Sequence, residues 1–446
     1  MTDALLAFGL LFSTTTQLRW HGGAVGPGVI AVVLWMIAIS FRIWRGGSRA
    51  DVGPAFVLLA FWSAMALAMS IGMMSAVGTG ARLDLGLVLH DVAAYALVAA
   101  MSILYGAAPL SGRRVCWMLV GGAALSLSLQ LLNASGAIRI PGVDPWYWSR
   151  LRGWSDNPNQ LAIGCLVVAL LAWHLADTAS RLAARIAAVA CLIPPLIAGR
   201  MSQSDTFFIA VTAALPVWFG VKLIVWMKDT RPGRSFRGAV ARLILVSIPL
   251  LIVSVAPLVM THAVDVETFA MGFLKKGGAE ADGEMMLRED LWHQALERGI
   301  ESGMLGLGPG PHLQMPAEIA AAHADDAAPP PDVSFPPQNG TANYEAHNTF
   351  LDVFVQGGLL AVVSLLGLMM RALKVAYRAA AAGFVSMLTS VAIFMTTGNI
   401  IRQPLFWFAV VLCLTASEGM SALQGVPRER TKTRGGMTGR AGEAAG

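Results

Sequence analysis

Long apolar runs, separated by short polar and basic segments, follow one another along most of the chain. A run of about 20 apolar residues is long enough to cross the ~30 Å hydrocarbon layer of a membrane as a helix. A helix also satisfies its own backbone polar groups there, which an isolated strand does not. The runs cover residues 4–18, 26–44, 54–74, 85–107, 115–134, 160–176, 182–198, 205–226, 240–261, 350–371, 378–399 and 404–422. The pattern predicts an all-α, polytopic membrane protein with about twelve transmembrane helices.

The composition supports the same class of protein and argues against several kinds of partner and site. Of the 446 residues, 56% are hydrophobic and 13% are charged, whereas soluble domains carry about 25% charged residues. In a membrane protein, the net charge of +5 reflects how basic residues are divided between the two sides of the membrane. We therefore expect no nucleic-acid partner. All four cysteines lie inside apolar runs, without a Cys-x-x-Cys motif. The sequence supports neither a disulfide framework nor a zinc site.

Basic residues assign a side of the membrane to each loop. Lys and Arg are enriched in the short cytoplasmic loops of membrane proteins. With a cytoplasmic N-terminus, every inner segment of this chain is basic. The inner clusters are Arg42, Arg45 and Arg49; Arg113 and Arg114; Arg181 and Arg185; Lys228, Arg231, Arg234, Arg237 and Arg242; Arg371, Lys374 and Arg378; and five basic residues between 428 and 440. This alternation predicts that both termini are cytoplasmic.

The remaining loops then lie outside, and one of them is large. Residues 262–347 hold fourteen acidic residues against four basic ones, and the segment is too long for a plain connection. The other outer pieces of note are the loop 135–159 and the turn 198–205. We predict spans one to nine in residues 1–261, an outer loop domain in 262–347, spans ten to twelve in 348–422 and a basic cytoplasmic tail in 423–446.

A few arginines lie outside and break the charge rule that the other loops obey. Those that stand out are Arg150, Arg152, Arg200, Arg288 and Arg402. Arginine stays charged and grips phosphate oxygens in a fork. Several arginines at the outer edge of separate helices favour an anionic ligand there, best a diphosphate headgroup on a lipid carrier. The alternative is that each one pairs with an acid or a lipid phosphate.

The stretch Tyr344-Glu-Ala-His-Asn348 places polar groups at the mouth of the tenth apolar run. An imidazole has an unperturbed pKa of ~6.5, so His347 suits proton abstraction from a hydroxyl near neutral pH. The alternative is a helix-end residue that bonds to lipid headgroups or backbone. Asn348 or Thr349 is expected to cap the helix. Glu345 either orients the imidazole or is solvated.

The preceding segment 286–312 is typical of an amphipathic helix followed by a glycine turn. Its expected apolar side, at a spacing of three to four residues, is Leu287, Leu291, Trp292 and Ala295. The run 306–310 is either a simple turn or one whose backbone approaches a ligand closely. For the loop histidines His293, His312 and His323 we favour a non-functional role. The Pro- and Ala-rich stretch 315–342 is typical of a flap or linker.

Four segments carry a resemblance to a known family. They are "RGWSDNPNQLA" (152–162), "AGRMSQSD" (198–205), "REDLWHQALERGIESGMLGLGPG" (288–310) and "EAHNTFLDVFVQGGLL" (345–360). In this order they resemble the O-antigen ligase and polysaccharide polymerase family of bacterial membrane glycosyltransferases, over roughly residues 20–420. The resemblance implies a GT-C-like fold in the inner membrane and a site that faces the periplasm. It implies a glycan donor on undecaprenyl diphosphate and an inverting transfer with no metal or other cofactor.

The resemblance also implies roles for individual residues. His347 falls on the family's histidine and would be the catalytic base, and Arg288 falls on its conserved loop arginine. Arg200 falls on the arginine of the short outer turn, although Gly199 precedes it where relatives often have serine. The full predicted set is His347 and Arg288 as catalytic residues, Arg200, Arg288, Arg152 and Arg402 as diphosphate ligands, and Glu345, Asn348, Asn159 and Trp292 in support.

Several functions stay open at the level of sequence. Within the family the acceptor is lipid A–core, which we favour, a growing polysaccharide or a protein. A polysaccharide or lipid transporter is the alternative of another class, and the polar pair His90-Asp91 inside the fourth run favours it. Transporters, however, usually show internal repeats and polar sites at mid-membrane, whereas polarity here gathers on one face. A scaffold that docks through the basic tail is a third possibility.

Overall fold

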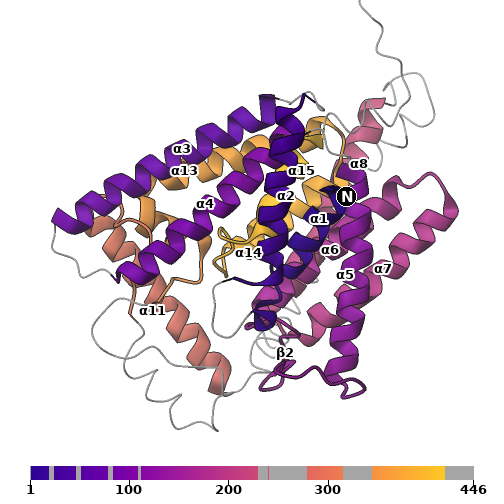
Figure 1. Ribbon diagram of the computed structural model, residues 1–446, viewed down its shortest axis with the longest axis horizontal. Helices are drawn as coiled ribbons and strands as arrows, with labels where there is room; N and C mark the ends of the chain where they lie inside the picture. The colour runs from indigo at the N-terminus through magenta and orange to yellow at the C-terminus, as the bar shows by residue number, and fades with distance from the viewer. Residues whose placement is uncertain are drawn as a thin grey trace, which may run out of the picture.

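The computed structural model describes residues 2–19, 25–46, 52–78, 84–108, 112–229, 240, 279–314 and 344–416. These residues form mainly helices (Figure 1). The elements are α1 (Thr2–Phe12), η1 (Thr16–Leu18), α2 (Pro27–Trp44), α3 (Val52–Gly78), α4 (Leu85–Ala107), α5 (Gly112–Ala134), β1 (Trp146–Tyr147), β2 (Arg150–Leu151), α6 (Pro158–Thr178), α7 (Leu182–Met201), α8 (Asp205–Asp229), α11 (Ala279–Glu301), α13 (Thr349–Arg378), α14 (Ala382–Met395) and α15 (Pro404–Leu414).

Eight of the described helices are long and apolar enough to cross a membrane. They are α2 to α8 and α13, and the shorter apolar helices are α1, α14 and α15. The chain is therefore a multi-pass, mainly helical membrane protein, as the apolar runs predict. The predicted ninth span, 240–261, lies outside the described residues except at its first position. The number twelve and the GT-C-like arrangement stay predictions.

Proline and asparagine mark where several helices begin. Pro27, Pro158 and Pro404 each occupy the first turn of a helix, where a missing N–H costs nothing. The Asn157 side chain accepts a hydrogen bond from Asn159 N at 2.8 Å and caps α6. The longest difference from prediction is in α13, which continues to Arg378, beyond the apolar run that ends at 371.

Hydrogen bonds join neighbouring segments at each of the two ends of the described helices. At the predicted outer end, Gln17 Nε2 donates to Asp144 O at 3.0 Å, and the hydroxyls of Thr206 and Thr397 are 2.7 Å apart. At the predicted inner end, Lys228 Nζ donates to the Tyr377 hydroxyl at 3.2 Å. The assignment of these ends to the two sides of the membrane stays a prediction.

Helices α3, α4 and α13 run side by side and carry the site at one end (Figure 1). Aromatic rings fill the space between them and α15, with the Trp62 and Trp407 ring centroids 4.5 Å apart. Trp62 Nε1 donates to Ser102 Oγ at 2.9 Å, which satisfies a buried polar group. Helix α11, drawn in salmon, packs beside the start of α13 and away from α5 and α7.

A glycine-rich turn docks on a kink in α13. Gly358 has φ 64° and ψ −162° inside that helix, a conformation essentially restricted to glycine. Leu307 N donates to Val355 O at 2.7 Å, and Gly308 N donates to Gln356 O at 2.8 Å. Leu359 N in turn donates to Met304 O at 2.9 Å. The close backbone approach of the glycine run is therefore to α13, and it fixes the loop after α11 to that helix.

Replacing Gly358 with alanine is expected to destabilise the outer half of the protein. A Cβ there would lie 2.1 Å from Met304 O, and the backbone conformation alone costs a non-glycine residue about 1–3 kcal/mol. Gly367→Ala is the matched control, because a Cβ at that position of the same helix meets nothing within 4 Å. Thermal unfolding of the purified variants in detergent measures the effect. Equal melting temperatures for the two variants would contradict it.

Candidate functional site

The predicted amphipathic helix exists as α11, and its apolar side is buried as predicted. Leu291 and Ala295 are fully buried in a small cluster with Ala346 and Val355. Leu287 and Trp292 pack against the same cluster. This apolar stripe attaches α11 to the start of α13 because its partners come from that helix and from the segment just before it.

Trp292 links α11 directly to the segment that carries His347. Its Nε1 donates to Ala346 O at 3.0 Å, and Ala346 N donates to Asp352 Oδ1 at 2.7 Å. Both backbone groups of Ala346 are thus held, by two different helices. Arg288 lies one helical turn before Trp292, where positions i and i+4 share a face. The structure therefore brings the Arg-x-x-x-Trp helix and the His-Asn segment together.

His347 itself adopts an unusual backbone conformation. Its φ is +51°, a left-handed value that is uncommon for a residue other than glycine. The ring is partly buried and lies edge-on to Tyr344, with centroids 5.3 Å apart and planes at 80°. Tyr344 is anchored by an antiparallel bridge to Leu313, with N–O distances of 3.1 and 3.0 Å. The imidazole therefore packs against a tyrosine whose own backbone is anchored.

The residues after His347 anchor the helix start. Asn348 Oδ1 accepts from Phe350 N at 3.0 Å and from Leu351 N at 3.3 Å, so Asn348 is the N-cap that the sequence allowed. The Thr349 hydroxyl instead donates to Gly398 O at 2.6 Å and accepts from Ile400 N at 3.1 Å. These bonds attach the histidine segment to the loop between α14 and α15.

That loop carries Arg402, which lies between two carboxylates. One guanidinium nitrogen donates to Asp91 of α4 and another donates to Glu345. The second oxygen of Glu345 accepts from Asn399 Nδ2 at 2.9 Å. Burial alone would lower the pKa of Arg402, but the carboxylates, Glu345 first and then Asp91, outweigh it and raise that pKa. The guanidinium is therefore charged, and Glu345 is an ion-pair partner.

The sequence did not predict that Asp91 forms an ion pair with one of the outer arginines. The pair His90-Asp91 inside an apolar run was its only signal. Asp91 is 2% exposed and also lies 3.3 Å from His90 Nδ1. A buried acid in a membrane helix is expected to have a partner. Arg402, more than three hundred residues later in the chain, is that partner.

Arg200 lies at the end of α7, with an exposed side chain. The neighbouring turn contacts the outer loop, because Arg150 Nε donates to Ser202 O at 3.1 Å. Arg150 also donates to Asn159 Oδ1 at 3.3 Å, which ties the predicted supporting residue Asn159 to this corner. Packing explains why glycine precedes Arg200, since a Cβ on Gly199 would lie 2.2 Å from the Phe207 ring.

Arg152 has a different environment from the other predicted phosphate ligands. Its side chain is 1% exposed. Its Nε donates to Asp144 O at 3.0 Å, and its second terminal nitrogen lies 3.3 Å from the Asp144 carboxylate. These contacts fasten the outer loop around β1 and β2. A diphosphate role for Arg152 stays a prediction that this burial does not favour.

The other loop histidines are not part of this group of contacts. His293 is exposed on α11. His312 is buried and donates from Nε2 to Gly308 O at 2.7 Å, and its burial lowers its pKa. His323 lies outside the described residues, as does the flap or linker predicted over 315–342. Within the described ranges, no group of three or more His, Cys, Asp or Glu is placed to hold a metal ion.

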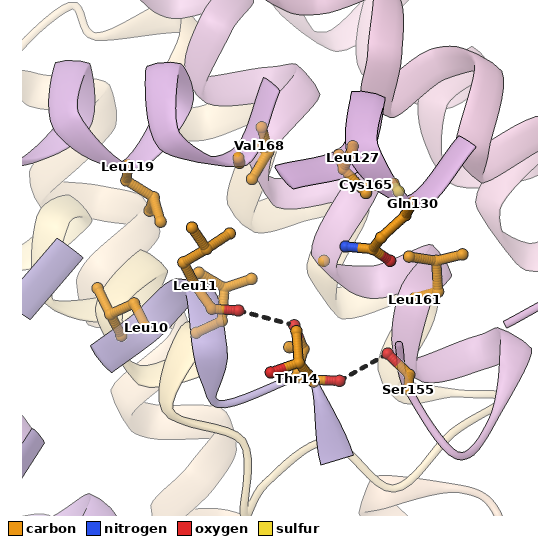
Figure 2. A pocket seen from close by; sticks show the side chains of 14 residues that line it. Leu10, Leu11, Thr14, Leu119, Leu127, Gln130, Ser155, Leu161, Cys165 and Val168 are labelled. Carbon is orange, nitrogen blue, oxygen red and sulfur yellow. Dashed lines mark hydrogen bonds between the residues drawn. The ribbon is translucent and has the colours of Figure 1, made fainter. Parts of the chain in front are cut away.

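A small cavity lies elsewhere, between α1, α5 and α6 (Figure 2). Its walls are mainly apolar, and its lining contains none of the predicted site residues. Four of its lining residues, Thr14, Thr15, Gln130 and Ser155, have polar side chains that can hydrogen-bond. The Ser155 hydroxyl donates to Thr14 O at 2.6 Å, so the cavity is closed by contacts that fasten α1 to the outer loop.

Comparison with known proteins covers three of the four segments quoted from the sequence, and the segment 152–162 lies just before the matched range. Residues 166–366 match the family described as O-antigen ligase. This range includes Arg200, Arg288, Trp292, the histidine segment and the kink of α13. A search of the curated proteins gave no match. Over these residues the chain is similar to the O-antigen ligase family, as the resemblance of its sequence segments predicts.

Proposed function

We propose that the protein is a membrane glycosyltransferase of the bacterial inner membrane. In this proposal it moves a glycan from undecaprenyl diphosphate to an acceptor hydroxyl at the periplasmic face. The observation that carries the proposal is the bond from Trp292 to Ala346 at 3.0 Å. It joins the helix of Arg288 to the segment of His347 inside the range that matches the family. The match to this family supports ligase-like or polymerase activity in general.

The proposed transfer needs a base for the acceptor and positive charge for the leaving group. His347 takes the proton of the acceptor hydroxyl, whose oxygen then attacks the anomeric carbon. The bond from that carbon to the diphosphate oxygen breaks, and the electron pair leaves with the lipid diphosphate. Attack from the face opposite the leaving group inverts the anomeric centre. One new glycosidic bond replaces one sugar–phosphate bond, and no oxidant or reductant is needed.

Arginine supplies the positive charge in this proposal. Negative charge builds on the departing diphosphate, and fixed cations aimed at it lower the barrier. Arg288 and Arg200 are the two proposed ligands because both come from the outer end and both lie in the matched range. A guanidinium holds two phosphate oxygens in one fork, so two of them are enough to neutralise a diphosphate without a divalent ion. The proposal includes no metal or organic cofactor.

The acceptor divides the proposal into two activities. A ligase transfers the finished glycan once, to lipid A–core, and we favour this activity because the resemblance to ligase segments is fuller. A polymerase instead adds the glycan to another copy of the lipid-linked repeat unit. Both use the same donor and the same base, so the acceptor has to be found by experiment.

Reconstitution of the purified protein with lipid-linked glycan tests the function. We expect one-step transfer to added lipid A–core, seen as a single shift of the product on a gel, and no reaction without it. Ladder growth without lipid A–core would identify a polymerase. If the glycan stays on its carrier with every acceptor but crosses sealed vesicles, the protein is a transporter and the proposal is wrong.

A further inference from the structure

Three acidic side chains and one arginine meet at the junction of α4, α13 and the loop after α14. Arg402 bonds to Asp91 and to Glu345, and Asp352 bonds to Ala346 N, one residue after Glu345. Asp91 and Asp352 are almost fully buried. The junction therefore connects a transmembrane helix to the segment that carries His347, through one guanidinium.

The histidine segment needs such external support. His347 has φ +51°, a left-handed backbone conformation that a non-glycine residue keeps only where its neighbours fix it. Trp292 and Asp352 hold the backbone on either side of Ala346. Glu345, the residue before Ala346, is held through its carboxylate, which accepts hydrogen bonds from Arg402 and Asn399.

We propose that Arg402 is a positioning residue. Through Glu345 it holds the His347 segment against Asp91 of α4, and it does not bind the donor diphosphate. The inference rests on the proposed function only in assuming that the segment is positioned so that His347 can act as the base. Arg402, Asp91 and Glu345 would act as one unit, with α4 as the fixed support.

Charge argues against the alternative that Arg402 binds a phosphate. Two carboxylates surround one guanidinium, so the three groups together carry a formal charge of −1. Both terminal nitrogens of Arg402 already donate to carboxylates. A diphosphate would have to displace one carboxylate and leave it without its cation in a partly dry site, which is costly.

A double-mutant cycle separates the two roles. The variants are Arg402→Met, Glu345→Gln and the pair together, with kcat and the donor KM measured for each. We expect each single change to lower kcat by about 10²-fold, the size of effect that a misplaced catalytic group produces. The donor KM should stay within about twofold, and the double variant should be no worse than the worse single one, because both act on one unit. A raised donor KM in Arg402→Met, additive to Glu345→Gln, would overturn the proposal.

A second measurement reports position without any transfer assay. Diethyl pyrocarbonate modifies accessible imidazoles, and mass spectrometry of the peptide that contains His347 gives its rate. We expect the same change in that rate, several-fold, in Arg402→Met and Glu345→Gln. Arg371→Met, at the far end of α13 and exposed, should leave the rate unchanged. An unaltered rate in both site variants would also overturn the proposal.

Arg402→Lys keeps the proposal testable if the methionine variant does not fold. Lysine keeps the charge but binds one carboxylate at a time instead of two. Its expected result is an intermediate kcat and an intermediate modification rate. If the wild-type protein transfers no glycan while the modification rates change as expected, the proposed function fails and the positioning role stands. A wild-type modification rate in Arg402→Lys and Glu345→Gln alike rejects the positioning role.

Discussion

Replacing His347 with alanine is expected to lower glycan transfer by about 10²–10⁴-fold, the usual contribution of a general base. The proton of the acceptor hydroxyl then has no fixed recipient when its oxygen attacks. The fold should survive, because Asn348 still caps α13 and Ala346 still bonds to Trp292 and Asp352. Initial rates with purified lipid-linked glycan and lipid A–core measure the loss, and thermal unfolding verifies the fold.

His293→Ala is the matched control for this change. His293 lies on α11 close to the site, and its side chain is exposed. Its removal should leave the transfer rate within about twofold of wild type, since a surface substitution of this kind is usually near neutral. If His347→Ala transferred glycan as fast as His293→Ala, the assignment of the base would be wrong.

Replacing Arg288 with alanine is expected to lower kcat by about 10²–10³-fold, the range for loss of one fixed group that stabilises developing charge. Arg288 is proposed to face the diphosphate as it departs, when its negative charge is greatest. Arg288→Lys should recover part of the rate, because lysine keeps the charge but cannot bind two oxygens in one fork. Single-turnover rates at saturating donor measure this effect without the contribution of product release.

Arg298→Ala tests whether any arginine of α11 would give the same result. Arg298 lies about 15 Å further along the helix axis and belongs to its last turn. We expect its removal to change the transfer rate by less than about threefold. Equal losses in Arg288→Ala and Arg298→Ala would mean that the net charge of the outer loop matters, and that no single arginine is a ligand.

The sequence predicted the local features of the fold well because their causes are local. Apolar run length sets the spans, and most of the described helices begin within a few residues of the predicted positions. The cap by Asn348 and the buried stripe of α11 follow from side chains within one or two helical turns. Such short-range patterns are readable from one sequence without knowledge of tertiary contacts.

The pairings of the outer arginines could not be predicted, because they depend on how the chain folds around each arginine. Asp144 precedes Arg152 in the same loop, but the sequence does not show that this loop folds back and buries the guanidinium against that carboxylate. Arg402 pairs with Asp91 through the packing of α15 against α4. The choice between an ion pair and a ligand contact is a property of that packing. Sequence alone therefore found the cations but not which of them are already paired.

The bridge between Leu313 and Tyr344 has a consequence for how the outer loop can change over time. Both ends of residues 315–343 return to one point beside α11, where backbone bonds of 3.1 and 3.0 Å close the loop. The position of His347 therefore does not depend on the length of that stretch. Insertions and deletions are tolerated where they do not disturb bonded or buried backbone. A change in the length of this stretch that keeps the bridge between Leu313 and Tyr344 is therefore expected to leave the histidine segment in place.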